Sequence, residues 1–143
     1  REPGITAMLN PGDYSLCDLA VTAALTGAAQ TPVQNLEGIL AATIEAKLYY
    51  GSGGTRMKAW VQVTLDDGAT WIDIACFAFT TGSGVKVVNL SGLTPVTTAV
   101  TPSDGSMADN TVQDGVLGSA MRVKLTSTGT YANTIMSVKV SVR

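Results

Sequence analysis

Short segments in which apolar and polar residues alternate, separated by turns rich in glycine and aspartate, limit the fold of this chain more than any other feature. Residues 58–65, 120–126 and 134–142 show the alternation most plainly. Successive side chains of a strand point to opposite faces of a sheet, so a period of two predicts strands with one buried face. At 143 residues the chain fits one domain, and we predict a single all-β domain.

We expect about eight strands, which is enough for a single antiparallel β-sandwich of the jelly-roll type. One segment is ambiguous, because the apolar residues of 36–50 recur at every fourth position, as in a helix, and also alternate. Its β-branched and tyrosine residues favour a strand over 41–50. The last two strands are expected to pair as an antiparallel hairpin. The expected strands are residues 16–25, 41–50, 58–65, 71–79, 85–90, 96–100, 120–126 and 134–142.

Two regions depart from this pattern. Residues 1–13 contain two prolines and two glycines, and they predict an extended N-terminal arm ahead of a β-sandwich domain at 14–143. Residues 91–118, here called the excursion, contain two prolines and no lysine or arginine. A connection of this length in a compact domain is usually functional or disordered. Its valine, leucine and methionine residues predict that it packs against another surface, and a neighbouring subunit is one candidate for that surface.

Composition removes several classes of function. The chain has no histidine, so Ser-His-Asp and Cys-His catalytic sets and histidine-containing metal sites cannot be built. Only 14% of the residues are charged and the net charge is −2, which does not favour nucleic-acid binding. The sequence also lacks the run of about 18 apolar residues that a membrane-spanning helix needs. No nucleophile–base set can be named, so we expect no enzyme and no cofactor.

The two cysteines, Cys17 and Cys76, do not form a CxxC pair, so a metal site built from cysteine is not expected. Cys76 lies in the apolar segment 71–79, where a free cysteine usually acts as a small buried hydrophobe. A Cys17–Cys76 disulfide stays open as an alternative, without support from the spacing.

The most specific local motif is the run TLDDGATW at residues 64–71. It resembles the Asp box, a structural β-hairpin turn of sialidases and other propeller proteins. In such a turn the aspartate accepts hydrogen bonds from turn amides, glycine takes a positive φ and tryptophan packs beneath. The motif occurs once, in a chain too short for a propeller, so it implies a turn and not sialidase activity. The residues assigned to this turn are Thr64, Asp66, Gly68, Thr70 and Trp71.

A calcium site around Asp66 and Asp67 is an alternative interpretation of the same turn. The further ligands would come from Asp73, Asp104, Asp109 or Asp114. The ligand spacing of an EF-hand is absent, and turn capping explains these residues more simply, so we expect no metal.

Four of the nine lysine and arginine residues would share the outer face of the expected C-terminal hairpin. The ordinary interpretation is a solvated strand face, which also discourages edge pairing. The alternative is a patch that docks on an acidic protein surface. The residues of this candidate patch are Arg122, Lys124, Lys139 and Arg143.

Residues 58–105 hold a strand, an Asp-Gly turn, a Thr-Trp pair and a strand ending in phenylalanine, and residues 114–143 hold an Arg-Val strand and a Thr-Gly-Thr turn. These features resemble small β-sandwich virion proteins of tailed bacteriophages. The resemblance implies a capsid decoration or cement protein on the capsid exterior, made in the host cytoplasm. It also implies the major capsid protein as partner and self-association as a trimer or dimer, which would fit capsid symmetry axes.

Other functions stay open beside this one. A neck or tail protein would belong to the same class but occur in fewer copies. A carbohydrate-binding module would need exposed aromatic faces, and aromatic residues are only 6% of the chain. The stacking candidates are Trp60, Trp71, Tyr49, Tyr50 and Tyr131. We interpret the low charge of the chain and the absence of cations from the excursion as marks of a chain that buries its loops in an assembly.

Overall fold

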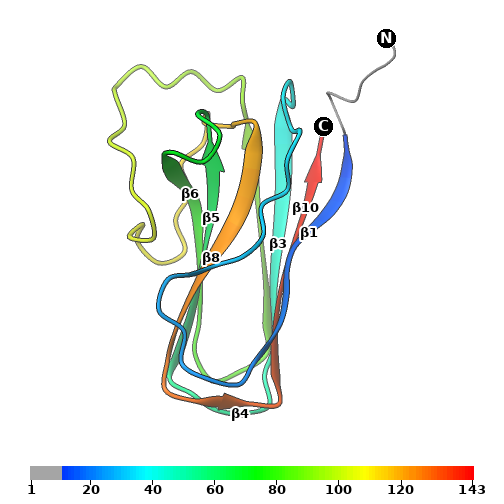
Figure 1. The fold of residues 1–143 in the computed structure, drawn as a ribbon, viewed down its shortest axis with the longest axis vertical. Coiled ribbons are helices and arrows are strands. Elements are labelled where there is room, and N and C mark those ends of the chain that lie inside the picture. The colour runs from blue at the N-terminus through cyan, green and yellow to red at the C-terminus, as the bar shows by residue number, and fades with distance from the viewer. Residues whose placement is uncertain (1–10) are drawn as a thin grey trace.

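Two antiparallel β-sheets face each other in the computed structural model, which describes residues 11–143 (Figure 1). The prediction of an all-β antiparallel sandwich is confirmed. Residues 1–10, most of the predicted arm, lie outside the described residues. The strands are β1 (Gly12–Val21), β2 (Ala28–Ala29), β3 (Ala41–Tyr49), β4 (Ser52–Gly53), β5 (Arg56–Thr64), β6 (Trp71–Phe79), β7 (Gly84–Ser91), β8 (Ala120–Thr128), β9 (Tyr131–Ala132) and β10 (Thr134–Val142).

The chain crosses from one sheet to the other at most of its turns. One sheet has the strand order β1-β10-β3-β7 and the other β2-β8-β5-β6, while the short strands β4 and β9 pair with each other. Among the described strands, only β5 and β6 are consecutive in the chain and also neighbours in one sheet. The turn between β5 and β6 carries the Asp-box-like motif. Among the described strands it is therefore the one connection that closes a hairpin within a single sheet.

The predicted hairpin of the last two strands is wrong. β8 and β10 lie in different sheets, and β9 carries the chain across one end of the sandwich between them. Met121 and Val123 of β8 and Met136 and Val138 of β10 are all buried in the same core. A period of two shows which face of a strand is buried, but it does not show which strand lies beside it. The pattern therefore fits strands on opposite sheets as well as a hairpin.

The strand boundaries otherwise follow the alternation. β6 and β10 have the predicted bounds, and the ambiguous segment at 36–50 contains strand β3. β1 starts earlier than expected, at Gly12, so residues 12 and 13 of the predicted arm pair with β10. It also ends at Val21, short of the expected residue 25.

The expected strand at 96–100 is wrong. Pro95 and Pro102 flank this segment, and proline cannot donate a hydrogen bond to a sheet. Val96 and Val100 are exposed, and no strand of the described chain pairs with them. The backbone groups of the excursion that bond a strand lie farther along, between residues 103 and 113, and they bond β6.

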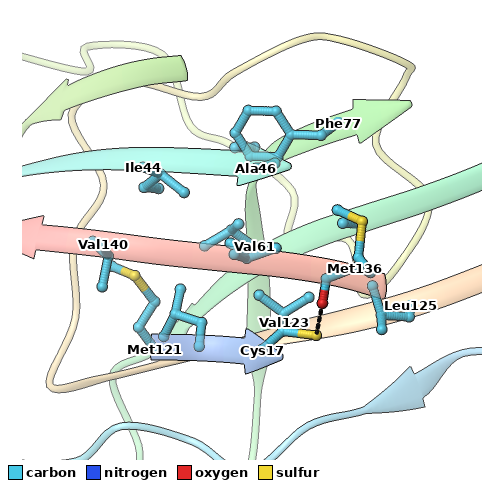
Figure 2. Close-up of a cluster of buried hydrophobic side chains, with 14 of the residues drawn as sticks. Cys17, Ile44, Ala46, Val61, Phe77, Met121, Val123, Leu125, Met136 and Val140 are labelled. Carbon is cyan, nitrogen blue, oxygen red and sulfur yellow. Dashed lines mark hydrogen bonds between the residues drawn. The ribbon is translucent and has the colours of Figure 1, made fainter. Parts of the chain in front are cut away.

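Figure 2 shows the core between the sheets, where inward-facing side chains of both sheets meet. Ile44 of β3, Val61 of β5 and Phe77 of β6 are each at most 2% exposed. Complete burial of such a side chain contributes roughly 1.5–3 kcal/mol. The alternation that defines the strands is therefore also what supplies the stability of the sandwich.

Both cysteines are buried free thiols, so the alternative of a disulfide is wrong. Cys17 lies on β1 and Cys76 on β6, in opposite sheets. The Cys17 thiol donates a hydrogen bond of 3.5 Å to the carbonyl oxygen of Met136 (Figure 2). Burial, reinforced by the nearby carboxylate of Asp18, raises the pKa of Cys17 to about 11.

We expect the protein to lose stability as the pH rises from about 9 to about 11. A thiol of the unfolded chain titrates near pH ~8.5, whereas folded Cys17 keeps its proton up to a pKa of about 11. Deprotonation in this window therefore favours the unfolded state. Urea unfolding midpoints at about pH 8 and about pH 10 measure the loss. Cys17→Ala should lose less between the two pH values, and an equal loss in both proteins would contradict the assignment.

Candidate functional site

The excursion (residues 91–118) lies along the outer edge of β6 and supplies the partners that an edge strand lacks. An unpaired strand edge is a template for unwanted pairing, so this cover protects one side of the sheet. An isolated bridge between Ala75 and Val112 completes the contact. The backbone hydrogen bonds run from Asp73 N to Ser103 O (2.8 Å), from Cys76 N to Thr111 O (3.0 Å) and from Gln113 N to Ile74 O (2.8 Å).

One buried carboxylate holds the middle of the excursion in place. Asp73 of β6 is only 2% exposed, and a buried charge is costly unless hydrogen bonds compensate it. Hydrogen bonds to an ionised group are roughly twice as strong as neutral ones, so this set of donors can offset the burial. The donors are the amides of Gly105 (2.9 Å), Ser106 (3.0 Å) and Met107 (3.1 Å), the hydroxyl of Ser103 (2.8 Å) and the side-chain amide of Gln62 (2.8 Å).

Asp104, beside this carboxylate, binds two of the predicted patch residues. Lys124 Nζ lies 2.8 Å from Asp104 Oδ1, and Arg122 Nη2 lies 3.5 Å from the same oxygen. Partial burial raises the pKa of Asp104, but hydrogen bonds from Lys124 and Gln62 outweigh it and lower the pKa below its usual value. The side chains of Arg122 and Lys124 thus secure the excursion to the sheet.

The four patch residues do not share one face. Arg122 and Lys124 belong to β8 and lie under the excursion. Lys139 lies on β10 in the opposite sheet, and Arg143 directly follows that strand. The expected common face depended on a β8–β10 hairpin, so it is lost together with that hairpin.

The turn residues predicted from the sequence do lie together. Thr64 Oγ1 accepts hydrogen bonds from the amides of Asp66 (3.3 Å) and Gly68 (2.9 Å) and donates one to Asp66 Oδ1 (2.9 Å). The Thr70 amide donates to Asp66 Oδ1 at 2.8 Å, and this bond, followed by that from Thr64, lowers the pKa of Asp66. Gly68 has a φ of 91°, which favours glycine.

The ring of Trp71 connects this turn to the residues that hold the excursion. A side chain at Gly68 would contact the Trp71 ring at 3.6 Å. The guanidinium of Arg122 lies 4.2 Å from the ring centroid of Trp71, within the range of a cation–π contact. The Trp71 ring thus packs against both the turn and the side chain of Arg122.

The aromatic residues do not form an open stacking platform. Trp60 is buried, and its indole NH donates to Met107 O of the excursion at 3.0 Å. Tyr131 is also buried, with Tyr50 packed edge-on against it at 6.1 Å between ring centroids. Tyr49, one of the five candidates for sugar stacking, is exposed, with 51% of its surface accessible. Because a sugar platform needs open aromatic faces, this placement does not favour the carbohydrate-binding alternative.

Exposed leucines gather at one end of the sandwich, which we call the leucine end and define by Leu40, Leu65 and Leu93. Their exposed fractions are 54%, 68% and 71%. Gly92 N donates to Leu40 O at 2.7 Å, which places Leu93 beside Leu40. Ser119 N donates to Thr64 O at 3.0 Å, so the end of the excursion returns next to Leu65. Figure 1 shows the β5–β6 turn, the start of β3 and the C-terminus at this same end.

Comparison with protein-family models, with curated proteins and with solved structures finds no match for this chain. Within residues 11–143 there is no helix of the length and hydropathy that crossing a membrane requires. The same residues contain no group of three or more cysteine, aspartate or glutamate side chains placed to hold a metal ion. From the sequence, Gln62 is not named as a site residue, and Asp73 and Asp104 are named as distant calcium ligands and not as the acceptors that hold the excursion. The lone acid in the apolar run 71–79 was the one available signal for them.

We expect Asp73→Asn to release the excursion. The substitution keeps the shape of the side chain but removes its charge and replaces one accepting oxygen by an NH₂ group. Depending on its orientation, either Gln62 Nε2 or the donors of Ser103, Ser106 and Met107 then face a donor in place of an acceptor. The free energy of unfolding should fall by at least about 2 kcal/mol, and subtilisin should cut within residues 91–118. Urea unfolding and mapped proteolysis measure the two effects.

Asp67→Asn is the matched control, because Asp67 lies at the exposed β5–β6 turn. It should change the free energy of unfolding by less than about 0.5 kcal/mol. Unchanged stability and an uncut excursion in Asp73→Asn would show that this carboxylate is not what holds it.

Proposed function

We propose that this chain is a structural protein of a bacteriophage virion, a capsid decoration or cement protein that binds the assembled capsid and stabilises it. The observation that carries the proposal is the leucine end. Three leucines more than half exposed lie at this end of the sandwich, and the first residue of β1 lies there too, since Gly12 pairs with Val142.

An apolar patch of this kind usually marks a surface that another molecule covers. Burying one leucine side chain contributes roughly 1.5–3 kcal/mol, so the three together can support a specific contact. A decoration protein is present in many copies, and repeated attachment raises the avidity without new contacts. The partner would be the major capsid protein, on the exterior of the virion.

The stable sandwich suits this role, because it presents the leucine end on a rigid support. Self-association as a trimer or dimer would place several leucine ends on one symmetry axis of the capsid. We also propose that the sandwich is of the jelly-roll type. The alternation of strands between the sheets β1-β10-β3-β7 and β2-β8-β5-β6 supports this.

The direct test is the copy number of this chain in purified particles of the phage whose genome encodes it. A decoration protein should be present in hundreds of copies and visible on the capsid surface by electron microscopy. A handful of copies at one vertex would indicate a neck or tail protein instead. Absence from the particles would exclude the virion role altogether.

The leucine end is tested separately with particles that lack this protein. Leu65→Ser and Leu93→Ser should each weaken re-binding to these particles by at least about tenfold, since each removes an apolar side chain from the contact. Ile135→Ser is the control, because Ile135 is also exposed and apolar but lies on β10 beside Tyr49, at the opposite end. Equal binding by all three variants would mean that another surface makes the contact.

A further inference from the structure

β7 is the edge strand of its sheet, and its free edge is open. It pairs with β3 on one side through residues 84–91 in an unbroken register. Val85 and Val87 are 56% and 57% exposed on the outer face. Its single charged side chain, Lys86, turns inward instead of protecting the edge, with Nζ donating to Ala78 O at 2.7 Å. A long, flat, apolar edge of this kind is a template for an added strand.

The hydrogen-bonding pattern shows which backbone groups of β7 are available. Ala41 and Arg143 exchange N–H···O bonds of 3.2 and 3.0 Å, so the odd-numbered residues of β3 bond β10 and the even-numbered ones bond β7. Through the register of β7 on β3, its odd-numbered residues therefore point their N–H and C=O away from β3. Ser91 N donates to Asp114 Oδ1 of the excursion at 2.7 Å. Within residues 11–143, the outward backbone groups of Val85, Val87 and Asn89 pair with no other strand or loop.

The other edges of the two sheets are protected. The excursion covers β6, and residues 28–36 cover β8 through bonds such as Gln30 N to Val123 O at 2.8 Å. β1 has a bulge beside Cys17 and an exposed Asp18, features that discourage pairing. β7 has neither a bulge nor a proline nor an outward charge, so it stands out as the edge built to accept a strand.

Two hollows lie on the inner side of this edge. One, of about 490 Å³, is lined by Gly84, Lys86 and Arg56, and the other, of about 410 Å³, by Lys86, Val88 and Phe77. The side chain of Lys86 lies between them. Because alternate side chains of an added strand point inward, residues opposite Gly84 and Val88 would fill the two hollows.

The charges of the first hollow indicate what it receives. Arg56 and Lys86 line this hollow together with a single carboxylate, Asp109. Asp109 lies 3.8 Å from Arg56 Nη1 and 2.8 Å from Nζ of Lys58, which lies next to the hollow. Three cations thus face one anion, although the whole chain carries a net charge of −2. The Arg56 side chain is 51% exposed and can reach a further carboxylate. The second hollow, between Phe77 and Val88, suits an apolar side chain.

We propose that the free edge of β7 binds an extended segment of a partner protein by strand addition, with an acidic side chain in the hollow beside Arg56 and an apolar one beside Val88. The acidic and apolar residues of that segment are four positions apart, as Gly84 and Val88 are on β7. A second copy of β7 is a poorer occupant, because it would bring two cationic hollows together and supply no carboxylate. The proposal does not depend on a role in a virion.

The test uses the whole protein and two fluorescently labelled peptides with threonine at every second position. One peptide has valine four residues before glutamate, and the other has glutamate four residues before valine. Fluorescence anisotropy should show binding of the first peptide, which matches an antiparallel addition, and a loss of at least about tenfold when its glutamate is replaced by glutamine. No binding of either peptide at millimolar concentration would overturn the proposal.

Val87→Pro is the decisive variant, because it removes an N–H that points out of the fold and is not used by it. Binding should fall at least tenfold while the circular dichroism spectrum stays unchanged, and Val87→Thr, which keeps the N–H, should bind within about twofold of the parent. Arg56→Gln should weaken binding of the glutamate peptide but not binding of its glutamine counterpart. This variant keeps the test valid if the proline variant misfolds. Undiminished binding by Val87→Pro, or self-association through β7 without peptide binding, would overturn the proposal.

Discussion

The surface of this sandwich depends on the buried carboxylate of Asp73. Three successive amides, at residues 105–107, and two side chains donate to it, so a stretch of chain with few apolar contacts of its own acquires one conformation. Once this stretch is fixed, Asp104 comes within reach of Arg122 and Lys124, and Met107 O meets the indole of Trp60. A charge that would be costly alone in the interior thus becomes the centre of a hydrogen-bonded network.

This anchoring decides which surfaces are left for other molecules. The backbone of the excursion pairs with the edge of β6, whereas two of its side chains contact β7. Asp114 Oδ1 accepts from Ser91 N at 2.7 Å and Asn110 Oδ1 accepts from Lys86 Nζ at 2.9 Å, which leaves the backbone edge of residues 85–89 without a paired strand. Because the excursion leaves the sheet at Gly92 and returns at Ser119, both of its ends lie beside Leu40 and Leu65. The open edge and the leucine end are therefore two consequences of one arrangement. The open edge offers backbone polar groups with cations beside it, whereas the leucine end is apolar.

Much of the fold was predictable, because it follows from a local pattern. The bounds of β10 could be read from alternation, those of β6 from an apolar run between two turns, and the hydrogen bonds of the turn at 64–71 from its residue types. Pairing was not predictable in the same way, since Met121 and Met136 look alike whether their strands are neighbours or face each other across the core. The site was harder still. Asp73 is conspicuous as the single acid of its strand, but its donors from the excursion lie 30 to 34 residues away in a segment without periodicity.

The absence of lysine and arginine from the excursion also takes on a different meaning in the structure. A loop without cations suggested burial against a neighbouring subunit, yet its amides and Ser103 are turned toward Asp73 and its backbone toward β6. Lysine or arginine among residues 103–107 would compete with those amides for the carboxylate, so the lack of cations there favours the intramolecular contact. The argument for an assembly therefore rests on what the fold leaves uncovered: Leu40, Leu65 and Leu93 at one end, and the backbone edge of β7 along one side.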